Sequence, residues 1–201
     1  MVHVPQSYYH RLDYGGAVPW DINKPQPAVC RAAREWPPGS RVIDCGCGAG
    51  DNAGWLARQG HRVVGFDLSP SAISTARRRH PGIEFFEASA MEIEIDDLFD
   101  IAVDSALLHC LEDADQRAYL RRLAPLVRPA GRIFLGCFSD ANPDPWDNPR
   151  RLSESHLRVL FDDDPWCLRD LQATWWERPS QRGSRTGGAW CMAWWCEIER
   201  L

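Results

Sequence analysis

The chain has 201 residues, of which 44% are hydrophobic and 25% are charged. This length and balance exclude a disordered chain and predict a globular domain that can bury a core without a disulfide or a metal. The net charge of −5 gives no general attraction for nucleic acid or for a membrane surface.

Targeting and redox signals point to one compartment. The sequence has no apolar run near the roughly 20 residues that span a bilayer, and residues 1–16 lack the apolar stretch of a signal peptide. We therefore expect a cytoplasmic protein whose eight cysteines stay reduced. The pair Cys45 and Cys47 has no partners at zinc spacing, so we predict no metal site.

Short apolar runs alternate with helical segments along residues 28–138. In chain order the sequence predicts helix Ala28–Glu35, strand Arg41–Asp44, helix Asn52–Gln59, strand His61–Phe66, helix Ser71–Arg79, strand Ile83–Glu87, strand Asp100–Asp104, helix Ala114–Val127 and strand Arg132–Phe138. Strands and helices that alternate at this spacing predict a parallel sheet with both faces covered.

The pattern changes after Asp140. A capped helix is expected at Ser153–Phe161, and two strands at Leu168–Arg178 and Gly188–Ile198 flank a hairpin connection with glycine at both ends. The predicted fold is α/β and Rossmann-like, with seven mostly parallel strands and a C-terminal antiparallel hairpin. We expect a single domain over 1–201. Residues 1–38 form a lid segment, 39–140 a cofactor-binding core, and 141–201 a substrate-side loop, helix and hairpin.

The strongest chemical signal is a glycine-rich turn after the first strand, Asp44-Cys-Gly-Cys-Gly-Ala-Gly50. Glycine lets the backbone approach a ligand where a Cβ would collide, and the helix that follows offers free N–H groups. Asp67 ends the next strand, 21 residues after Gly46, which is the spacing at which a carboxylate binds ribose hydroxyls. The sequence therefore predicts an adenosine-containing cofactor. The glycine spacing differs from that of a dinucleotide site, and no P-loop follows.

Several motifs resemble those of one enzyme class. Residues 44–50 with Asp67 resemble motif I and the acidic loop of class I S-adenosylmethionine-dependent methyltransferases, and Arg128-Pro-Ala-Gly131 resembles the turn before a later strand of that class. Residues 18–27 and 103–109 resemble the thiopurine and tellurite-resistance type, similar to bacterial methyltransferases of heterocycles and quinones. The resemblance covers residues 14–140 well and the rest in outline.

The resemblance implies S-adenosylmethionine as cofactor, S-adenosylhomocysteine as product, and a set of cofactor contacts. The methionine part would be held by Asp44, Gly46, Cys47, Gly48 and Gly50. Asp67 would bind the ribose and Leu68 would lie against the adenine. Ser89 stands where the class usually has an aspartate, Ala90 and Met91 would flank the ring, and Trp20 would cover the cofactor.

Two residues after the fourth strand are candidates for catalysis. Asp104 and His109 should lie at the carboxyl edge of the sheet, where α/β proteins bind ligands. Asp104 would receive the cofactor's ammonium group, and His109 would remove a proton from the acceptor. Two alternatives stay open: His109 caps or packs the turn, or the reaction needs only alignment.

A tryptophan cluster predicts an aromatic acceptor. One tryptophan of each pair, Trp175/Trp176 and Trp194/Trp195, should join the core, and the others, with Trp146 and Trp166, would wall an aromatic pocket. We therefore predict methyl transfer to O, S or N of a small aromatic or heterocyclic metabolite. The alternatives are an RNA or protein methyltransferase, which would want a basic face, and a non-catalytic cofactor-binding regulator. The oligomeric state is not predicted.

Overall fold

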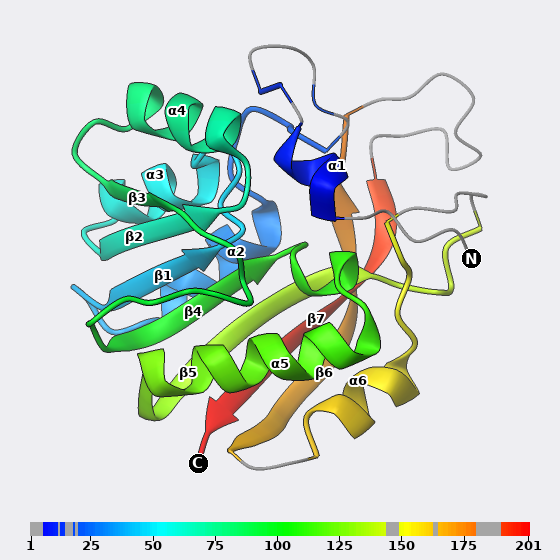
Figure 1. Cartoon of the computed structure of the whole chain (residues 1–201). Helices are drawn as coiled ribbons and strands as arrows, with labels where there is room; N and C mark the ends of the chain where they lie inside the picture. The colour runs from blue at the N-terminus through cyan, green and yellow to red at the C-terminus, as the bar shows by residue number, and fades with distance from the viewer. Residues whose placement is uncertain are drawn as a thin grey trace.

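The computed structural model describes residues 6–11, 13–14, 18, 20–143, 149–162, 165–179 and 190–201. Seven strands form one sheet in the order β3-β2-β1-β4-β5-β7-β6 (Figure 1). The strands are β1 (Arg41–Cys45), β2 (Arg62–Asp67), β3 (Glu84–Glu87), β4 (Phe99–Ser105), β5 (Val127–Phe138), β6 (Trp166–Glu177) and β7 (Trp190–Arg200). Strands β1 to β5 are parallel, and β7 is antiparallel to both of its neighbours. This confirms the predicted fold class.

Helices cover both faces of the sheet. They are α1 (Gln6–His10), α2 (Pro27–Ala32), α3 (Asp51–Arg58), α4 (Pro70–Arg79), α5 (Asp113–Leu123) and α6 (Glu154–Leu160). Successive strand side chains point to opposite faces, so Val42 packs with α2, α3 and α4 while Ile43 packs with α5 and α6. Figure 1 shows α5 and α6 together along the same part of the sheet. Two apolar cores therefore hold one sheet between them.

Several predicted boundaries differ from the structure. The expected helix 114–127 ends at Leu123, since a 3₁₀ turn at Ala124–Leu126 contains Pro125, and β5 begins at Val127. The expected turn at 129–131 instead lies within β5 as an irregularity in its pairing with β4, with Ala130 at φ 60°. The expected helix 28–35 ends at Ala32 and continues as a 3₁₀ turn. The predicted hairpin connection, like Trp146, lies outside the described residues.

The strand order places a crevice at the centre of the sheet. The chain runs outward from β1 through β2 to β3, then returns to β4 and runs the other way to β5. The loops after β1 and β4 therefore diverge, and ligands of open α/β sheets bind at such a switch point.

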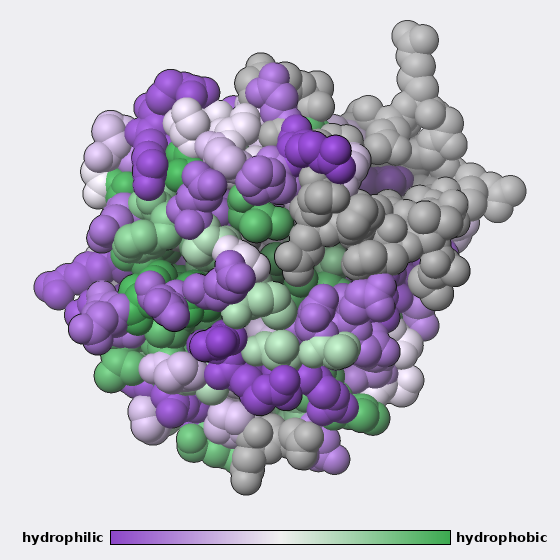
Figure 2. All heavy atoms as spheres, viewed as in Figure 1, coloured by the Kyte–Doolittle hydropathy of each residue, from purple (hydrophilic) through white to green (hydrophobic). Residues whose placement is uncertain are grey.

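The surface in the same view mixes polar residues with smaller apolar patches (Figure 2). None of the helices in the described part of the chain combines the length and apolar character that crossing a bilayer requires.

Candidate functional site

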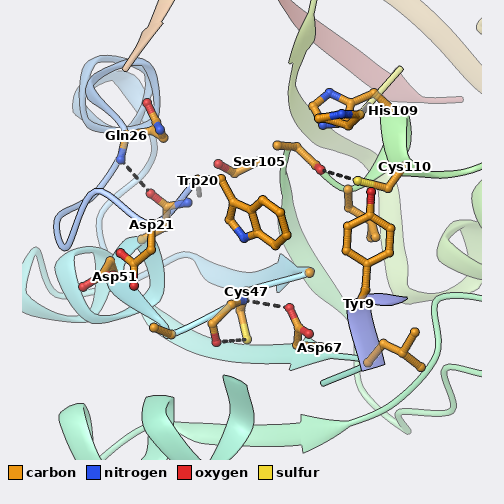
Figure 3. A pocket seen from close by; sticks show the side chains of 18 of the residues that line it. Tyr9, Trp20, Asp21, Gln26, Cys47, Asp51, Asp67, Ser105, His109 and Cys110 are labelled. Atoms are coloured by element: carbon orange, nitrogen blue, oxygen red, sulfur yellow. Dashed lines mark hydrogen bonds between the residues drawn. The ribbon is translucent and has the colours of Figure 1, made fainter. Parts of the chain in front are cut away.

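A cavity of about 430 Å³ lies at the carboxyl ends of the central strands. We call its two ends the β1 side, lined by Gly46, Cys47, Gly48, Asp67 and Ser89, and the β4 side, lined by Tyr9, Ser105, His109, Phe138 and Trp176. Figure 3 shows the Trp20 indole between Asp67 and Ser105. The cavity therefore joins the glycine turn to a pocket rich in aromatic rings.

The glycine turn forms the floor of the β1 side. Gly46 has φ 65° and Gly48 has φ 54°, a left-handed region that favours glycine. A Cβ on Gly46 would lie 3.0 Å from the Cβ of Leu107 in the loop after β4. The turn thus lets the loops after β1 and β4 approach each other beneath the cavity.

Asp67 is the carboxylate that the β1 side presents. Its Oδ2 accepts from the Gly48 N–H at 2.9 Å and its Oδ1 from the Ser69 N–H at 2.8 Å. Each carboxylate oxygen has about two acceptor positions, so Asp67 can accept further hydrogen bonds from a ligand. Burial raises the pKa of this carboxyl, while the two backbone N–H groups lower it.

Asp44 lies beneath the turn and does not line the cavity. It is fully buried, and its Oδ2 accepts from the Ala53 N–H of α3 at 3.1 Å. Gly50, at φ 82°, likewise starts α3 outside the cavity lining. Asp44 and Gly50 therefore fix the start of α3, and this position does not support the direct cofactor contact expected for them.

The N-terminal segment covers the cavity. The Tyr14 N–H donates to Ser71 Oγ at 2.8 Å, and Trp20 Nε1 donates to the Tyr14 hydroxyl at 3.2 Å. Trp20 is half-buried and lines the cavity, where Tyr9 of α1 also lies. The rings of Tyr9 and Trp20 are 5.9 Å apart. We call this N-terminal segment, whose described residues run from Tyr9 to Gln26, the aromatic cover.

Two polar contacts fasten this cover to distant elements. Gln26 exchanges two hydrogen bonds with the backbone of Glu177 at the end of β6, at 2.7 and 3.3 Å. Arg79 of α4 bonds Asp51 at 3.2 Å and Asn23 at 3.1 Å. The cover is thereby tied to both halves of the sheet.

Asp104 supports the turn after β4 instead of facing the cavity. It is fully buried, and its Oδ1 accepts from the N–H groups of Leu107 and Leu108 at 2.9 and 3.2 Å. Burial raises its pKa to about 6. Asp104 does not line the cavity, which does not support the expected contact with the cofactor's ammonium group. The next residue, Ser105, points the other way and lines the cavity.

His109 lies in the 3₁₀ turn Leu108–Cys110 and lines the β4 side. The Phe138 N–H donates to its Nδ1 at 3.1 Å, and the two rings stack with centroids 4.7 Å apart. Burial, with the charge of Arg150, lowers the pKa of His109 to about 3. So low a pKa disfavours the proton-removing role that the sequence suggested.

Among the described tryptophans of the cluster, Trp176 lines the cavity. Trp176 is buried and lines the β4 side, where Gly136 makes room for it, because a Cβ there would lie 2.2 Å from the indole. Trp175 is 54% exposed, and Trp166 is buried in the core against α5 and α6. The expected pocket walls at Trp166 and Trp175 are therefore wrong.

The cavity includes part of the predicted set and several unpredicted residues. Trp20, Gly46, Cys47, Gly48, Asp67, Leu68, Ser89, Ala90 and His109 line it, whereas Asp44, Gly50, Met91 and Asp104 do not. The residues that sequence reasoning missed include Tyr9, Tyr14, Asp21, Gln26, Asn52, Ser105, Leu107 and Phe138. Ser105 could have been found, since it directly follows Asp104. The others come from α1, the N-terminal segment, the start of α3, the turn after β4 and the end of β5, which only the folded chain brings together.

Comparison with known proteins shows similarity to methyltransferases. Residues 42–131 match the model of a methyltransferase domain. The chain is 29% identical over 160 residues to 2-heptyl-1-hydroxyquinolin-4(1H)-one methyltransferase of Mycobacteroides abscessus, covering 76% of this chain and 70% of that protein. It is 34% identical over 130 residues to fatty-acid O-methyltransferase of Mycolicibacterium smegmatis, covering 61% of this chain and 45% of that protein.

Solved structures share this fold over most of the chain. A structure described for the conversion of a disulfide bond into a thioacetal group during echinomycin biosynthesis has a TM-score of 0.81 and 29% identity, covering 96% of this chain and 88% of that one. Burkholderia thailandensis 1,6-didemethyltoxoflavin-N1-methyltransferase, solved with S-adenosylhomocysteine, has a TM-score of 0.68 and 23% identity, covering 87% and 77%. At 23% identity, the similarity to the toxoflavin enzyme shows a shared fold.

The sheet order, the glycine turn with Asp67 and the domain match define a class I methyltransferase with a Rossmann-like fold. The chain is an S-adenosylmethionine-dependent methyltransferase, and S-adenosylmethionine is its cofactor. The structure is compatible with this cofactor, because Asp67 faces a cavity whose floor is the left-handed glycine turn.

Proposed function

We propose that this enzyme methylates an O, S or N atom of a small aromatic or heterocyclic metabolite. The observation that carries the proposal is the β4 side of the cavity, where Tyr9, Phe138 and Trp176 line one continuous space with the β1 side. Aromatic side chains bind flat rings well through offset or edge-to-face contacts. The quinolone methyltransferase among the relatives agrees with such an acceptor.

The cofactor belongs on the β1 side in this proposal. The backbone of Gly46, Cys47 and Gly48 holds its methionine part, and Asp67 accepts from the ribose hydroxyls. Leu68, Ser89 and Ala90 surround the adenine, and Trp20 covers the cofactor from above. Asp44 acts indirectly, because its hydrogen bond to Ala53 fixes the helix that follows the turn.

The chain contributes mainly alignment to the reaction. The bound cofactor supplies a methyl group on a positively charged sulfur. The aromatic cover and the β4 side hold the acceptor in line with that methyl group and exclude water. Alignment of two reactants can contribute about 7 to 11 kcal/mol to lowering the barrier.

The test is methyl transfer itself. The protein is incubated with S-[methyl-³H]adenosylmethionine and a panel of phenols, quinolones, thiols and heterocyclic amines, with bulk RNA and denatured protein as alternative acceptors. Label in one small-molecule class supports the proposal. Label in RNA or protein, or tight cofactor binding without transfer to any acceptor, contradicts it and favours a macromolecular acceptor or a regulator.

A further inference from the structure

The position of the proton on His109 follows from its hydrogen bond. Nδ1 accepts from the Phe138 backbone N–H at 3.1 Å, and a ring nitrogen that accepts a hydrogen bond carries no proton. A neutral imidazole has one proton, so that proton is on Nε2. His109 is thus a donor at Nε2 and has no acceptor atom left.

The ring is held before any acceptor binds. It stacks on Phe138 at an interplanar angle of 25°, and only 1% of the residue is exposed. Below it, Gln116 Nε2 donates to the carbonyls of Leu108 and Leu111, each at 3.2 Å, and so secures both ends of the turn. An Nε2–H fixed in this way can orient a ligand at little further entropic cost.

The ring also borders the cavity, and Nε2 has no hydrogen-bond partner among the residues that the structure describes. The other titratable groups there are poor proton acceptors near neutral pH. Burial raises the pKa of the Tyr9 hydroxyl, and it raises the pKa of the Cys110 thiol to about 12. Both groups therefore keep their own proton near neutral pH. Glu177 is paired with Lys24 at 2.8 Å. The described part of the β4 side thus offers a donor without a matching base.

A charge outside the cavity also acts on the ring. Burial and the charge of Arg150 both lower the pKa of His109 and keep its ring neutral. Arg150 is itself paired with Asp113 at 2.6 Å and does not line the cavity. A ring that stays neutral keeps its single proton as a donor.

We propose that His109 orients the methyl acceptor by donating from Nε2–H, and that the acceptor binds with its nucleophilic atom already unprotonated. This inference rests on the proposed function above. The acceptor chemistry that fits is a planar ring with a carbonyl or anionic oxygen for Nε2–H and a group that ionises near neutral pH. The nucleophile's lone pair forms the new bond to the methyl carbon as the carbon–sulfur bond breaks. No proton leaves the acceptor in this step, and S-adenosylhomocysteine departs neutral at sulfur.

The first test needs no acceptor. Long-range ¹H–¹⁵N spectra of the ¹⁵N-histidine-labelled protein report the tautomer of each ring, and the His109→Gln variant assigns the signal. We expect His109 to be the Nε2–H tautomer throughout pH 5 to 8. A proton on Nδ1, or titration near pH 6.5, would overturn the proposal.

The second test is kinetic and uses 1-hydroxyquinolin-4(1H)-one, 4-nitrophenol and unsubstituted phenol. His109→Gln keeps one donor and one acceptor in a plane, whereas His109→Phe keeps neither, so we expect the Phe variant to lose about 10- to 100-fold in kcat/KM with the quinolone and Gln to recover most of it. Cofactor affinity should stay within about twofold in both variants.

The outcomes separate the two proposals. If Gln is as impaired as Phe, or if phenol reacts as fast as the ionised 4-nitrophenol, His109 is not a donor to an ionised acceptor. If the wild-type enzyme methylates none of the probes while the tautomer is as expected, the proposed acceptor class fails and the assignment of the ring stands.

Discussion

Three aspartates near strand ends, two of them buried and Asp67 half-buried, have different tasks although they look alike in the sequence. Asp44 and Asp104 accept from backbone N–H groups of the segments that follow them, while Asp67 borders the cavity. A strand-terminal acid can bind the backbone or a ligand, and the choice depends on which way the next loop turns. The spacing between Gly46 and Asp67 predicted the ligand role for Asp67. The sequence could not show that Ser105 lines the cavity and that Asp104 does not.

Asp67→Asn should weaken cofactor binding. A charged acceptor strengthens a hydrogen bond to about 1.5–3 kcal/mol, so its loss should raise the Kd for S-adenosylhomocysteine about 10- to 100-fold. Isothermal titration calorimetry measures this change, and Asp96→Asn, an exposed aspartate outside the cavity, is the matched control. An unchanged Kd in a folded Asp67→Asn protein would remove Asp67 from the cofactor site.

Asp44→Asn should change how stability depends on pH. Burial raises the pKa of Asp44 to about 8 from an ordinary value of 3.8. The folded state then binds this proton more tightly than the unfolded state, so the stability that it contributes is fully present below about pH 4 and is lost as the pH rises to about 8. Asparagine has no such proton, and its amide oxygen can still accept from the Ala53 N–H.

The measurement for Asp44 is the melting temperature of the ligand-free protein at pH 5 and pH 8. We expect the variant to gain stability relative to the wild type on going from pH 5 to pH 8. Asp96→Asn again serves as control. An equal difference at both pH values would mean that Asp44 is ionised in the folded protein.

At the scale of elements, the sequence was sufficient to predict a helix or strand where one physical signal dominated. Alternating apolar runs with helix caps gave the five parallel strands, and the changed pattern after Asp140 gave the last two. Boundaries moved where signals competed, as at Pro125, where a 3₁₀ turn ends the helix and β5 begins early. The tryptophans show the limit, because the orientation of Trp166 and Trp175 depends on the edge position of β6, which no local pattern encodes.

The contact between the N-terminal cover and β6 gives an element-scale prediction. Gln26→Ala removes both bonds to the Glu177 backbone and leaves polar groups without their partners, which costs about 1–3 kcal/mol of stability. Hydrogen exchange at residues 176–178 should accelerate, and the melting temperature should fall. Gln59→Ala, at an exposed position after α3, is the control. Unchanged exchange would mean that the cover does not depend on this contact.

At the scale of the whole molecule, one sheet links the β1 side of the cavity to its β4 side. Strand β4 lies between β1 and β5, and both cores extend across it. The cover adds contacts to α4, through the hydrogen bond of Arg79 to Asn23, and to β6, through Gln26. Stabilisation of the site should therefore spread to the entire domain, including the C-terminal strands.

Thermal unfolding with S-adenosylhomocysteine tests this coupling. At 100 times the Kd, binding to the folded state alone adds about 2.7 kcal/mol, which for a domain of this length raises the melting temperature by about 5–10 °C. We expect a single transition that moves as a whole, because β7 pairs with β5 along seven residue positions. Methionine, which lacks the adenosine, should produce no comparable shift. Two transitions, only one of which moves with the ligand, would show that the C-terminal strands unfold separately from the cofactor-binding core.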